Sequence, residues 1–249
     1  MNKTITCPSG LSGEIRGLTG KAFELLTDRK LQRSGLFVDK ILDQCWVQTI
    51  DTGPYAFAEG AKPDWQKVLV GDRFFAIMQV RCCLYGPVYE FQVKCGDCGR
   101  PINWTVDLEE QLTIRKLSDE DREAFLNGNR VTGQLPDGRT FTFKLPTGAD
   151  ERRAAQLDDQ PSAFMATLIS RIIEIEGVPE GGMRRFFEDA DMSVMFGVLA
   201  EMDRHDCGVQ TDFEVECQNP RCGSVQSVQI PFGQGFLVPK RARTGQGAL

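Results

Sequence analysis

Alternating apolar and polar positions mark two strands, far apart in the chain, that each run into a pair of cysteines. Residues 91–95 read F-x-V-x-C, and Cys98-Gly99 follows after a spacer of two residues. Residues 213–217 repeat the pattern, and there Cys222-Gly223 follows after a spacer of four residues. A period of two places neighbouring side chains on opposite faces of a strand. Each copy is therefore predicted to belong to a β-hairpin that carries two thiols at its turn.

The rest of the chain predicts helices joined by short antiparallel hairpins. Hairpins are expected at 3–16, 88–106, 130–145 and 211–230, the third around Pro136-Asp137-Gly138. Helices are expected at 20–33, 36–47, 73–84, 118–126, 148–156, 162–176 and 188–204, with a loop at 48–63. The segment 73–84 is apolar around most of its circumference, which predicts a buried central helix.

These elements predict an α+β fold with a discontinuous zinc-ribbon-like module, formed by the two cysteine-bearing hairpins. Four regions are expected along the chain. They are 1–60 with the N-terminal hairpin, two helices and a loop; 61–147 with the buried helix, the first zinc hairpin and a second hairpin; 148–206 as a helical insertion; and 207–249 with the second zinc hairpin and a C-terminal tail.

Composition is that of an ordinary soluble protein, with 41% hydrophobic and 26% charged residues among 249. No apolar run approaches the roughly 18 residues of a membrane span, and the N-terminus lacks the apolar core of a signal peptide. Nine cysteines without an export signal favour reduced thiols and metal binding over a disulfide framework. The net charge of −6 over the whole chain gives no support to nucleic-acid binding.

The two cysteine pairs predict a structural Zn2+ site with four thiolate ligands, Cys95, Cys98, Cys217 and Cys222. The glycine after each second cysteine suits a turn that needs a positive φ. A disulfide or redox pair and unpaired buried thiols remain alternatives. The other cysteines are interpreted as small buried hydrophobes, with His205 and Cys207 as weaker candidate ligands: Cys7, Cys45, Cys82, Cys83 and Cys207.

Catalysis is not expected. Four thiolates leave a zinc ion no open position, and the chain has a single histidine, no H-E-x-x-H motif and no glycine-rich nucleotide motif. A zinc-ribbon nucleic-acid-binding module is the alternative, although the charge around the two turns is mixed and the basic tail at Lys240, Arg241 and Arg243 is short. A thiol-disulfide oxidoreductase is a weaker alternative, because the first C-x-x-C tips a hairpin and does not follow a βαβ pattern.

Four stretches of the chain carry a resemblance: LSGEIRGLTGKAFELL, DWQKVLVGDRFFAIMQVR with YGPVYEFQVKCGDCG, LPDGRTFTFKLPTGADE, and DFEVECQNPRCGSVQSVQIPFGQGFLVP. Together they resemble the baseplate proteins of contractile-tailed bacteriophages and their prophage relatives, the family that includes the T-even-type baseplate hub assembly proteins. The resemblance covers most of the chain, with gaps near 105–130 and 150–190. The four-residue spacer after Cys217 departs from the expected two, so the second turn must differ locally.

The resemblance implies a non-enzymatic structural or assembly component of a contractile tail baseplate. Its expected partners are other tail and baseplate proteins, with no membrane, nucleic acid or small-molecule substrate. Its expected location is the virion tail, and the host cytoplasm during assembly. The N-terminal hairpin, the loop 48–63 and the C-terminal tail are expected to become ordered against neighbouring subunits. Five aromatic residues are expected at such contacts: Trp46, Tyr55, Phe57, Phe232 and Phe236.

Overall fold

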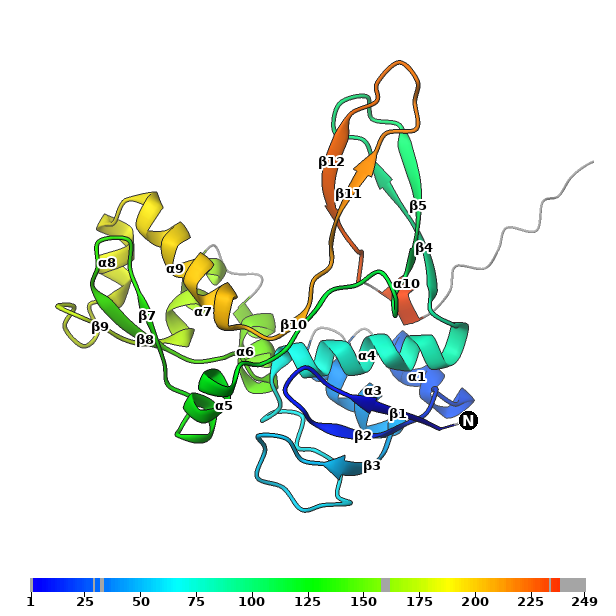
Figure 1. Cartoon of the computed structure of the whole chain (residues 1–249), viewed down its shortest axis with the longest axis horizontal. Helices are drawn as coiled ribbons and strands as arrows, with labels where there is room; N and C mark the ends of the chain where they lie inside the picture. Colours follow the sequence, from blue (N-terminus) through cyan, green and yellow to red (C-terminus); the bar gives the residue numbers. More distant parts are fainter. Residues whose placement is uncertain (1, 29, 32–33, 158–161, 233, 238–249) are drawn as a thin grey trace, which may run out of the picture.

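One long helix, α4, lies at the centre of the protein, which has three parts (Figure 1). The computed structural model describes residues 2–28, 30–31, 34–157, 162–232 and 234–237. We call the part up to residue 85, which includes α4, the body. The projecting pair of hairpins at 88–107 and 212–229 is the tower, and residues 118–205 form the lobe. Helices and short antiparallel sheets alternate throughout, so the predicted α+β class is confirmed.

The body contains a three-stranded antiparallel sheet in the order β1-β2-β3. The predicted N-terminal hairpin is confirmed, with Ile5 opposite Gly13. The strands are β1 (Lys3–Thr6), β2 (Ser12–Ile15) and β3 (Trp46–Asp51), and the helices are the 3-10 turn η1 (Gly20–Ala22), α1 (Phe23–Thr27), α3 (Phe37–Cys45) and α4 (Val70–Tyr85).

Two expectations for the body are wrong. The helix predicted at 20–33 is broken at Asp28, whose backbone is extended, and its Arg29 and Arg33 lie outside the described residues. The helix predicted at 36–47 ends at Cys45, and strand β3 occupies the start of the expected loop at 48–63. Long-range packing explains the strand. The buried indole of Trp46 lies over Gly13 so closely that a Cβ there would be 2.3 Å from a ring carbon.

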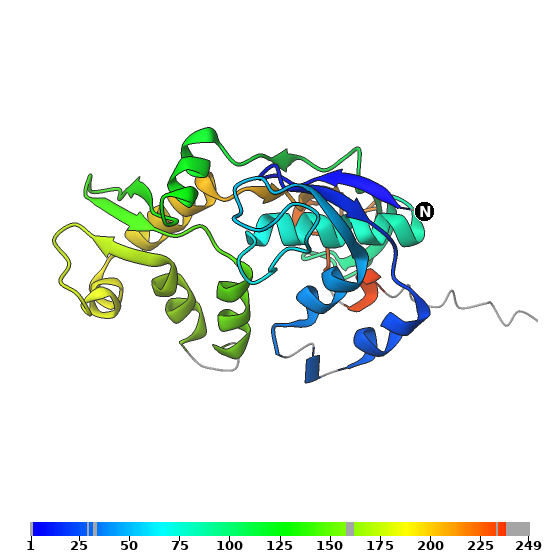
Figure 2. The same cartoon turned by 90° about the horizontal axis from the view of Figure 1, so that it is seen from below.

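The helix α4 is buried along most of its length, as predicted for 73–84. The sheet β1-β2-β3 lies on one side of it and the tower rises from the other, while α3 and α6 lie beside it (Figures 1 and 2). Even its polar positions Asp72, Arg73, Gln79 and Arg81 are buried. Because buried polar groups must be hydrogen-bonded to avoid a large desolvation cost, these side chains mark the points where α4 holds its neighbours.

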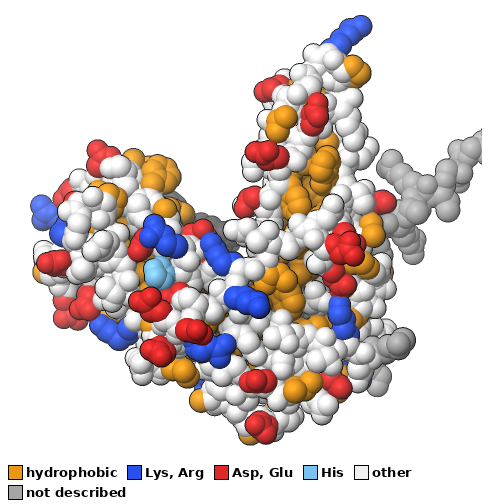
Figure 3. Space-filling view, in the orientation of Figure 1, with side chains coloured by type: hydrophobic (Ala, Val, Ile, Leu, Met, Phe, Trp, Pro, Cys, Tyr) orange, Lys and Arg blue, Asp and Glu red, His pale blue; other side chains and the backbone are white. Residues whose placement is uncertain are grey.

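The tower consists of two antiparallel hairpins from distant parts of the chain. Its strands are β4 (Val88–Lys94), β5 (Pro101–Asp107), β11 (Asp212–Glu216) and β12 (Val225–Gln229). Buried side chains alternate with exposed ones along each strand, and Phe91, Ile102, Val215 and Val228 are among the buried set. Hydrophobic side chains accordingly run up the tower in Figure 3. The short helix α10 (Gln234–Leu237) lies at its foot (Figure 1).

The lobe surrounds a second three-stranded sheet in the order β7-β8-β9. The hairpin predicted around Pro136-Asp137-Gly138 is confirmed. The helix predicted at 162–176 ends at Arg171, because Ile172–Ile175 pairs with β8, and the helix α8 was not predicted. The elements are α5 (Asp119–Leu126), β7 (Val131–Gln134), β8 (Thr140–Phe143), α6 (Gly148–Leu157), α7 (Ala163–Arg171), β9 (Ile172–Ile175), α8 (Met183–Asp189) and α9 (Met192–His205).

Two short strands, β6 (Ile114–Arg115) and β10 (Gly208–Val209), pair where the chain passes between tower and lobe. The expectation that certain aromatic residues face partner subunits is wrong for Trp46, Tyr55 and Phe236, which are buried within this chain; Phe57 and Phe232 are half-buried. The predicted basic tail from Lys240 lies outside the described residues. No helix in the described part of the chain has the length and hydropathy needed to cross a membrane.

Candidate metal centre

Four cysteines meet at the tip of the tower. Cys95 and Cys98 come from the turn between β4 and β5, and Cys217 and Cys222 come from the turn between β11 and β12. Their Sγ atoms all lie within 4.8 Å of one another. The Cys95–Cys222 separation is 3.8 Å and the Cys98–Cys217 separation is 3.6 Å. The structure therefore brings together all four residues that the sequence predicts, although they are up to 127 positions apart.

The sulfur positions fit one tetrahedral ion. Zinc–sulfur bonds of about 2.3 Å in a regular tetrahedron place neighbouring sulfurs roughly 3.8 Å apart. The two separations above are close to that value, and neither is the roughly 2 Å of a disulfide bond. Four thiolates form the soft donor set that zinc takes in structural sites. These residues can hold a metal ion, and bound zinc would supply a rigid tie between the two hairpins.

The two turns reach the same geometry with spacers of different length. In the first, the N–H of Gly99 donates to the carbonyl of Cys95; in the second, the N–H of Gly223 donates to the carbonyl of Asn219. Asn219 thus takes the acceptor role that Cys95 has in the shorter turn. The two extra residues of the longer turn therefore lie before Asn219 in the chain. Gly99 and Gly223 have φ of +68° and +60°, a conformation that favours glycine. The expected local difference between the turns is confirmed.

Polar groups around the sulfurs favour thiolates at some positions. The Ser224 hydroxyl, 3.3 Å from Sγ of Cys95, and the backbone N–H of Cys98 lower the pKa of Cys95 to about 6. The backbone N–H of Arg100 lowers the pKa of Cys98. The backbone N–H of Asn219 acts in the same direction on Cys217, but burial and the neighbouring sulfurs outweigh it and raise that pKa to about 12. Four thiols this close cannot all ionise without a cation between them.

The hairpins are also joined by direct hydrogen bonds beside the cluster. The side chain of Gln226 in β12 accepts from the N–H of Gly96 at 2.8 Å and donates to the carbonyl of Lys94 at 3.2 Å. Gln218, in the turn after β11, donates to the carbonyl of Asn103 in β5 at 3.1 Å. These contacts join the two turns directly beside the four cysteines.

The other thiols and the histidine lie away from this cluster, which contains only the four predicted cysteines within the described residues. Cys7, Cys45 and Cys82 are buried, and burial raises the pKa of Cys45 and Cys82 to about 12. His205 lies in the lobe, where its Nδ1 is 2.6 Å from a carboxylate oxygen of Asp121. Cys207 is half-buried beside Gly71, at the N-terminal end of α4.

The residues Gly71-Asp72-Arg73 at the start of α4 have a structural role that their sequence pattern does not reveal. A Cβ on Gly71 would lie 2.0 Å from the carbonyl oxygen of Cys207, so only glycine allows the chain to pass there on its way to the tower. The buried carboxylate of Asp72 accepts hydrogen bonds from the N–H and hydroxyl of Ser9 and from the hydroxyl of Tyr55. Asp72 therefore holds the N-terminal sheet.

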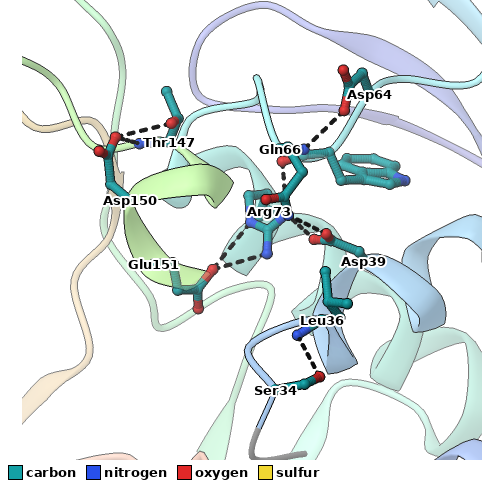
Figure 4. Close-up of polar contacts among 10 residues, drawn as sticks. Ser34, Leu36, Asp39, Asp64, Gln66, Arg73, Thr147, Asp150 and Glu151 are labelled. Atoms are coloured by element: carbon teal, nitrogen blue, oxygen red, sulfur yellow. Dashed lines mark hydrogen bonds and ion pairs between the residues drawn. The ribbon is translucent and has the colours of Figure 1, made fainter. Parts of the chain in front are cut away.

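Arg73 connects α4 to the helices α3 and α6 (Figure 4). Its guanidinium is 1% exposed, pairs with Asp39 of α3 and Glu151 of α6, and donates to the carbonyl of Trp65 at 2.7 Å. Gln66 donates to the second oxygen of Asp39. The G-D-R pattern before an apolar segment was visible in the sequence. Its side-chain contacts were not, since all except the one with the Trp65 carbonyl depend on residues from 17 to 136 positions away.

Comparison with known proteins gives one finding. A sequence model of the family described as T4 bacteriophage base plate protein matches residues 14–236, which include α4, both tower hairpins and all four clustered cysteines. No match was found among curated proteins or among solved structures.

Proposed function

Because this chain belongs to the T4 bacteriophage base plate protein family, we propose that it is a non-enzymatic component of a contractile-tail baseplate, held in shape by a structural zinc ion. The family supports a structural role in a phage tail, and hence a location in the virion. Its partners in this proposal are other tail and baseplate proteins. It would meet them in the host cytoplasm during assembly, whether or not it then remains in the particle.

The cysteine cluster at the tip of the tower is the observation that supports a structural role best. All four thiols converge on one point, so a bound ion would have no open position for a substrate or a water nucleophile. Its contribution would be to lock two hairpins whose cysteines are separated by more than a hundred residues. Such a tie suits a part that has to keep one shape while neighbouring subunits press on it.

The nucleic-acid alternative has little support from the tower surface. The outward positions of β11 are Asp212, Glu214 and Glu216, all exposed, and they form an acidic row that would repel phosphates. Acidic side chains line the left edge of the tower in Figure 3. The expected result is that the protein is not retained by double-stranded DNA even at low salt. Retention that weakens steeply as salt rises would support the alternative.

The lowered pKa values of Cys95 and of the exposed Cys98 favour a thiol oxidoreductase. The same shift is what a zinc ligand requires, and Cys95 is only 2% exposed. Alkylation distinguishes the two functions. If the four clustered cysteines bind zinc (the zinc clasp), their thiols should stay unmodified by iodoacetamide until a chelator is added. Rapid modification of Cys95 in the metal-loaded protein would instead favour the redox function.

Disruption of the gene in a phage that encodes this chain tests the main proposal. We expect filled heads without functional baseplates in electron micrographs, and full recovery when the wild-type chain is supplied from a plasmid. A phage that assembles normal, infectious tails without the chain would overturn the baseplate role, whatever the metal content of the purified protein.

A further inference from the structure

A cavity of about 560 Å3 lies at the foot of the tower, away from the metal centre. Its walls come from the C-terminal end of α4, the start of β4, and the segment that leads from β12 into α10. Arg81 of α4 is the cation among its lining residues. Neither the four clustered cysteines nor Gly71-Asp72-Arg73 line this cavity.

The guanidinium of Arg81 is held inside an aromatic cage. Its carbon lies 4.6 Å from the ring centroid of Tyr89, 5.4 Å from that of Phe236 and 5.8 Å from that of Tyr85. Two of its five N–H groups are used, one on the carbonyl of Gly86 at 3.0 Å and one on that of Val88 at 3.2 Å. The Nε–H is buried and has no acceptor among the described residues.

No carboxylate in the described part of the chain compensates this charge. Within the described residues, Arg81 forms no ion pair within 4.0 Å, although the residue is only 7% exposed. Glu90 also lines the cavity, but it is exposed and does not reach the guanidinium. Buried charges in proteins are normally paired, because desolvation is costly and ring faces offset only part of it. Arg73 on the same helix shows the usual solution, with two carboxylate partners.

Apolar groups at the rim indicate what kind of molecule approaches. Tyr85 is 45% and Val88 is 51% exposed, and both line the cavity. A buried arginine surrounded by exposed tyrosine and aliphatic side chains is the composition of a protein-binding hot spot. We propose, building on the baseplate function above, that this cavity receives an acidic side chain of a neighbouring protein subunit, whose carboxylate pairs with Arg81.

A carboxylate fits the cavity better than a phosphate does. A single cation matches one negative charge, and Glu90 nearby would repel a second one. The hydroxyls of Tyr85 and Tyr89 are already committed to the carbonyls of Leu237 and Pro231, so they do not add donors for a tetrahedral anion. The ring faces suit the aliphatic stem of a glutamate. The planar fork of the guanidinium can bind both oxygens of a carboxylate.

Side-chain NMR of the full chain tests the pairing directly. The probes are glutamate blocked as its N-acetyl amide, the matching glutamine compound, and inorganic phosphate. The expected result is a saturable shift of the Arg81 Nε–H signal with the glutamate probe, and at least about tenfold weaker binding of the glutamine probe. An equal response to both blocked amino acids, tighter binding of phosphate, or no response at all would each overturn the proposal.

Arg139 is an internal control in the same spectrum. It also lies over an aromatic ring, 5.0 Å from the centroid of Phe186, but it already pairs with Asp137 at 2.6 Å. Its Nε–H signal should not move. Arg81→Met and Arg139→Met assign the two signals.

The same variants connect the cavity to assembly. Arg81→Met should keep full metal content and the wild-type near-ultraviolet circular dichroism, yet lower incorporation of the chain into baseplates by at least about tenfold. Arg139→Met should be incorporated normally. Normal incorporation of Arg81→Met would overturn the proposal while leaving the baseplate function intact. Failure of the wild-type chain itself to support baseplate assembly would overturn the function instead.

Discussion

Nη2 of Arg73 lies 2.9 Å from a carboxylate oxygen of Glu151, and this ion pair joins α4 of the body to α6 of the lobe. The second partner of Arg73, Asp39, is much less exposed: its side chain is 10% exposed, against 41% for Glu151. The same guanidinium therefore makes one inner and one outer ion pair.

The two pairs should differ in their effect on stability. Asp39→Asn leaves a buried cation with one partner fewer and should lower the free energy of unfolding by roughly 3–5 kcal/mol. Glu151→Gln weakens a pair that water screens, and should cost less than about 1 kcal/mol. Urea unfolding monitored by circular dichroism measures both. Equal losses would show that exposure does not set the strength of these pairs.

Metal content tests the proposed clasp. If the clasp is correct, the wild type binds one zinc ion per chain; Cys217→Ser should lose this ion, and its Tm should fall by more than about 10 °C. Cys83→Ser is the matched control, because Cys83 is half-buried and lies outside the cluster. It should keep the metal. Atomic absorption and thermal scans give the two readouts, and full zinc in Cys217→Ser would refute a four-thiolate site.

The glycines in the cysteine turns offer a test of backbone geometry. Gly99→Ala and Gly223→Ala should each destabilise the metal-loaded protein by about 1–2 kcal/mol, because both residues have a left-handed conformation. Neither site is crowded, so the cost is conformational. Gly96→Ala in the same turn, whose added Cβ would make only an ordinary contact with Gln226, should change little. Chelator titration of unfolding compares the three variants.

Gly71→Ala should be far more harmful than a typical helix substitution. Its added Cβ would overlap the carbonyl oxygen of Cys207, a backbone atom that cannot rotate away. We expect a loss of more than about 3 kcal/mol in urea unfolding, in line with overpacking of a close backbone approach. Gly20→Ala, which meets no atom within 4 Å, is the control and should be nearly neutral.

The pH dependence of stability reports on Asp72. Burial raises the pKa of this carboxyl above its ordinary value of 3.8, although Ser9 and Tyr55 act against the rise. The folded chain therefore keeps the proton where the unfolded chain has lost it. The contribution of Asp72 is fully present below about pH 4 and is lost as the pH rises through the folded pKa.

Asp72→Asn cannot titrate, so the stability difference between wild type and variant isolates this group. The wild-type chain should lose stability relative to Asp72→Asn as the pH rises from about 4 through the raised pKa of the folded state. Parallel urea titrations at each pH measure the difference. A difference that stays constant, or that changes in favour of the wild type, contradicts the assignment.

Local patterns predict the tower and the ends of several elements correctly. Strict alternation in β4 and β11 shows which side chains are inside, and Ser118 indeed accepts a hydrogen bond from the N–H of Asp121 at the start of α5. The repeated cysteine pattern also predicts that the two cysteine pairs lie together, because four thiols suit one metal ion. In each case the signal lies within a few residues or in a matching repeat.

Elements that depend on distant packing could not be predicted in this way. Strand β3 forms because Trp46 packs on Gly13 and because β2 offers a free edge, and neither fact is local to residues 46–51. Ile172–Ile175 leaves its helical register to pair with β8. The partners of Arg73 and the cage around Arg81 join residues that no periodicity relates, so their charges appear in the sequence as ordinary basic residues on a helix.

The two legs of the tower leave α4 at opposite ends. Strand β4 follows its C-terminal residue Tyr85 almost directly, while the path to β11 passes Gly71 near its N-terminus. The sixteen residues of α4 span about 24 Å, which makes it a wide footing. A sideways load on the tip of the tower would therefore push one leg against one end of α4 and pull the other leg away from its opposite end. Tilting the tower then requires rotating a helix that is buried along most of its length.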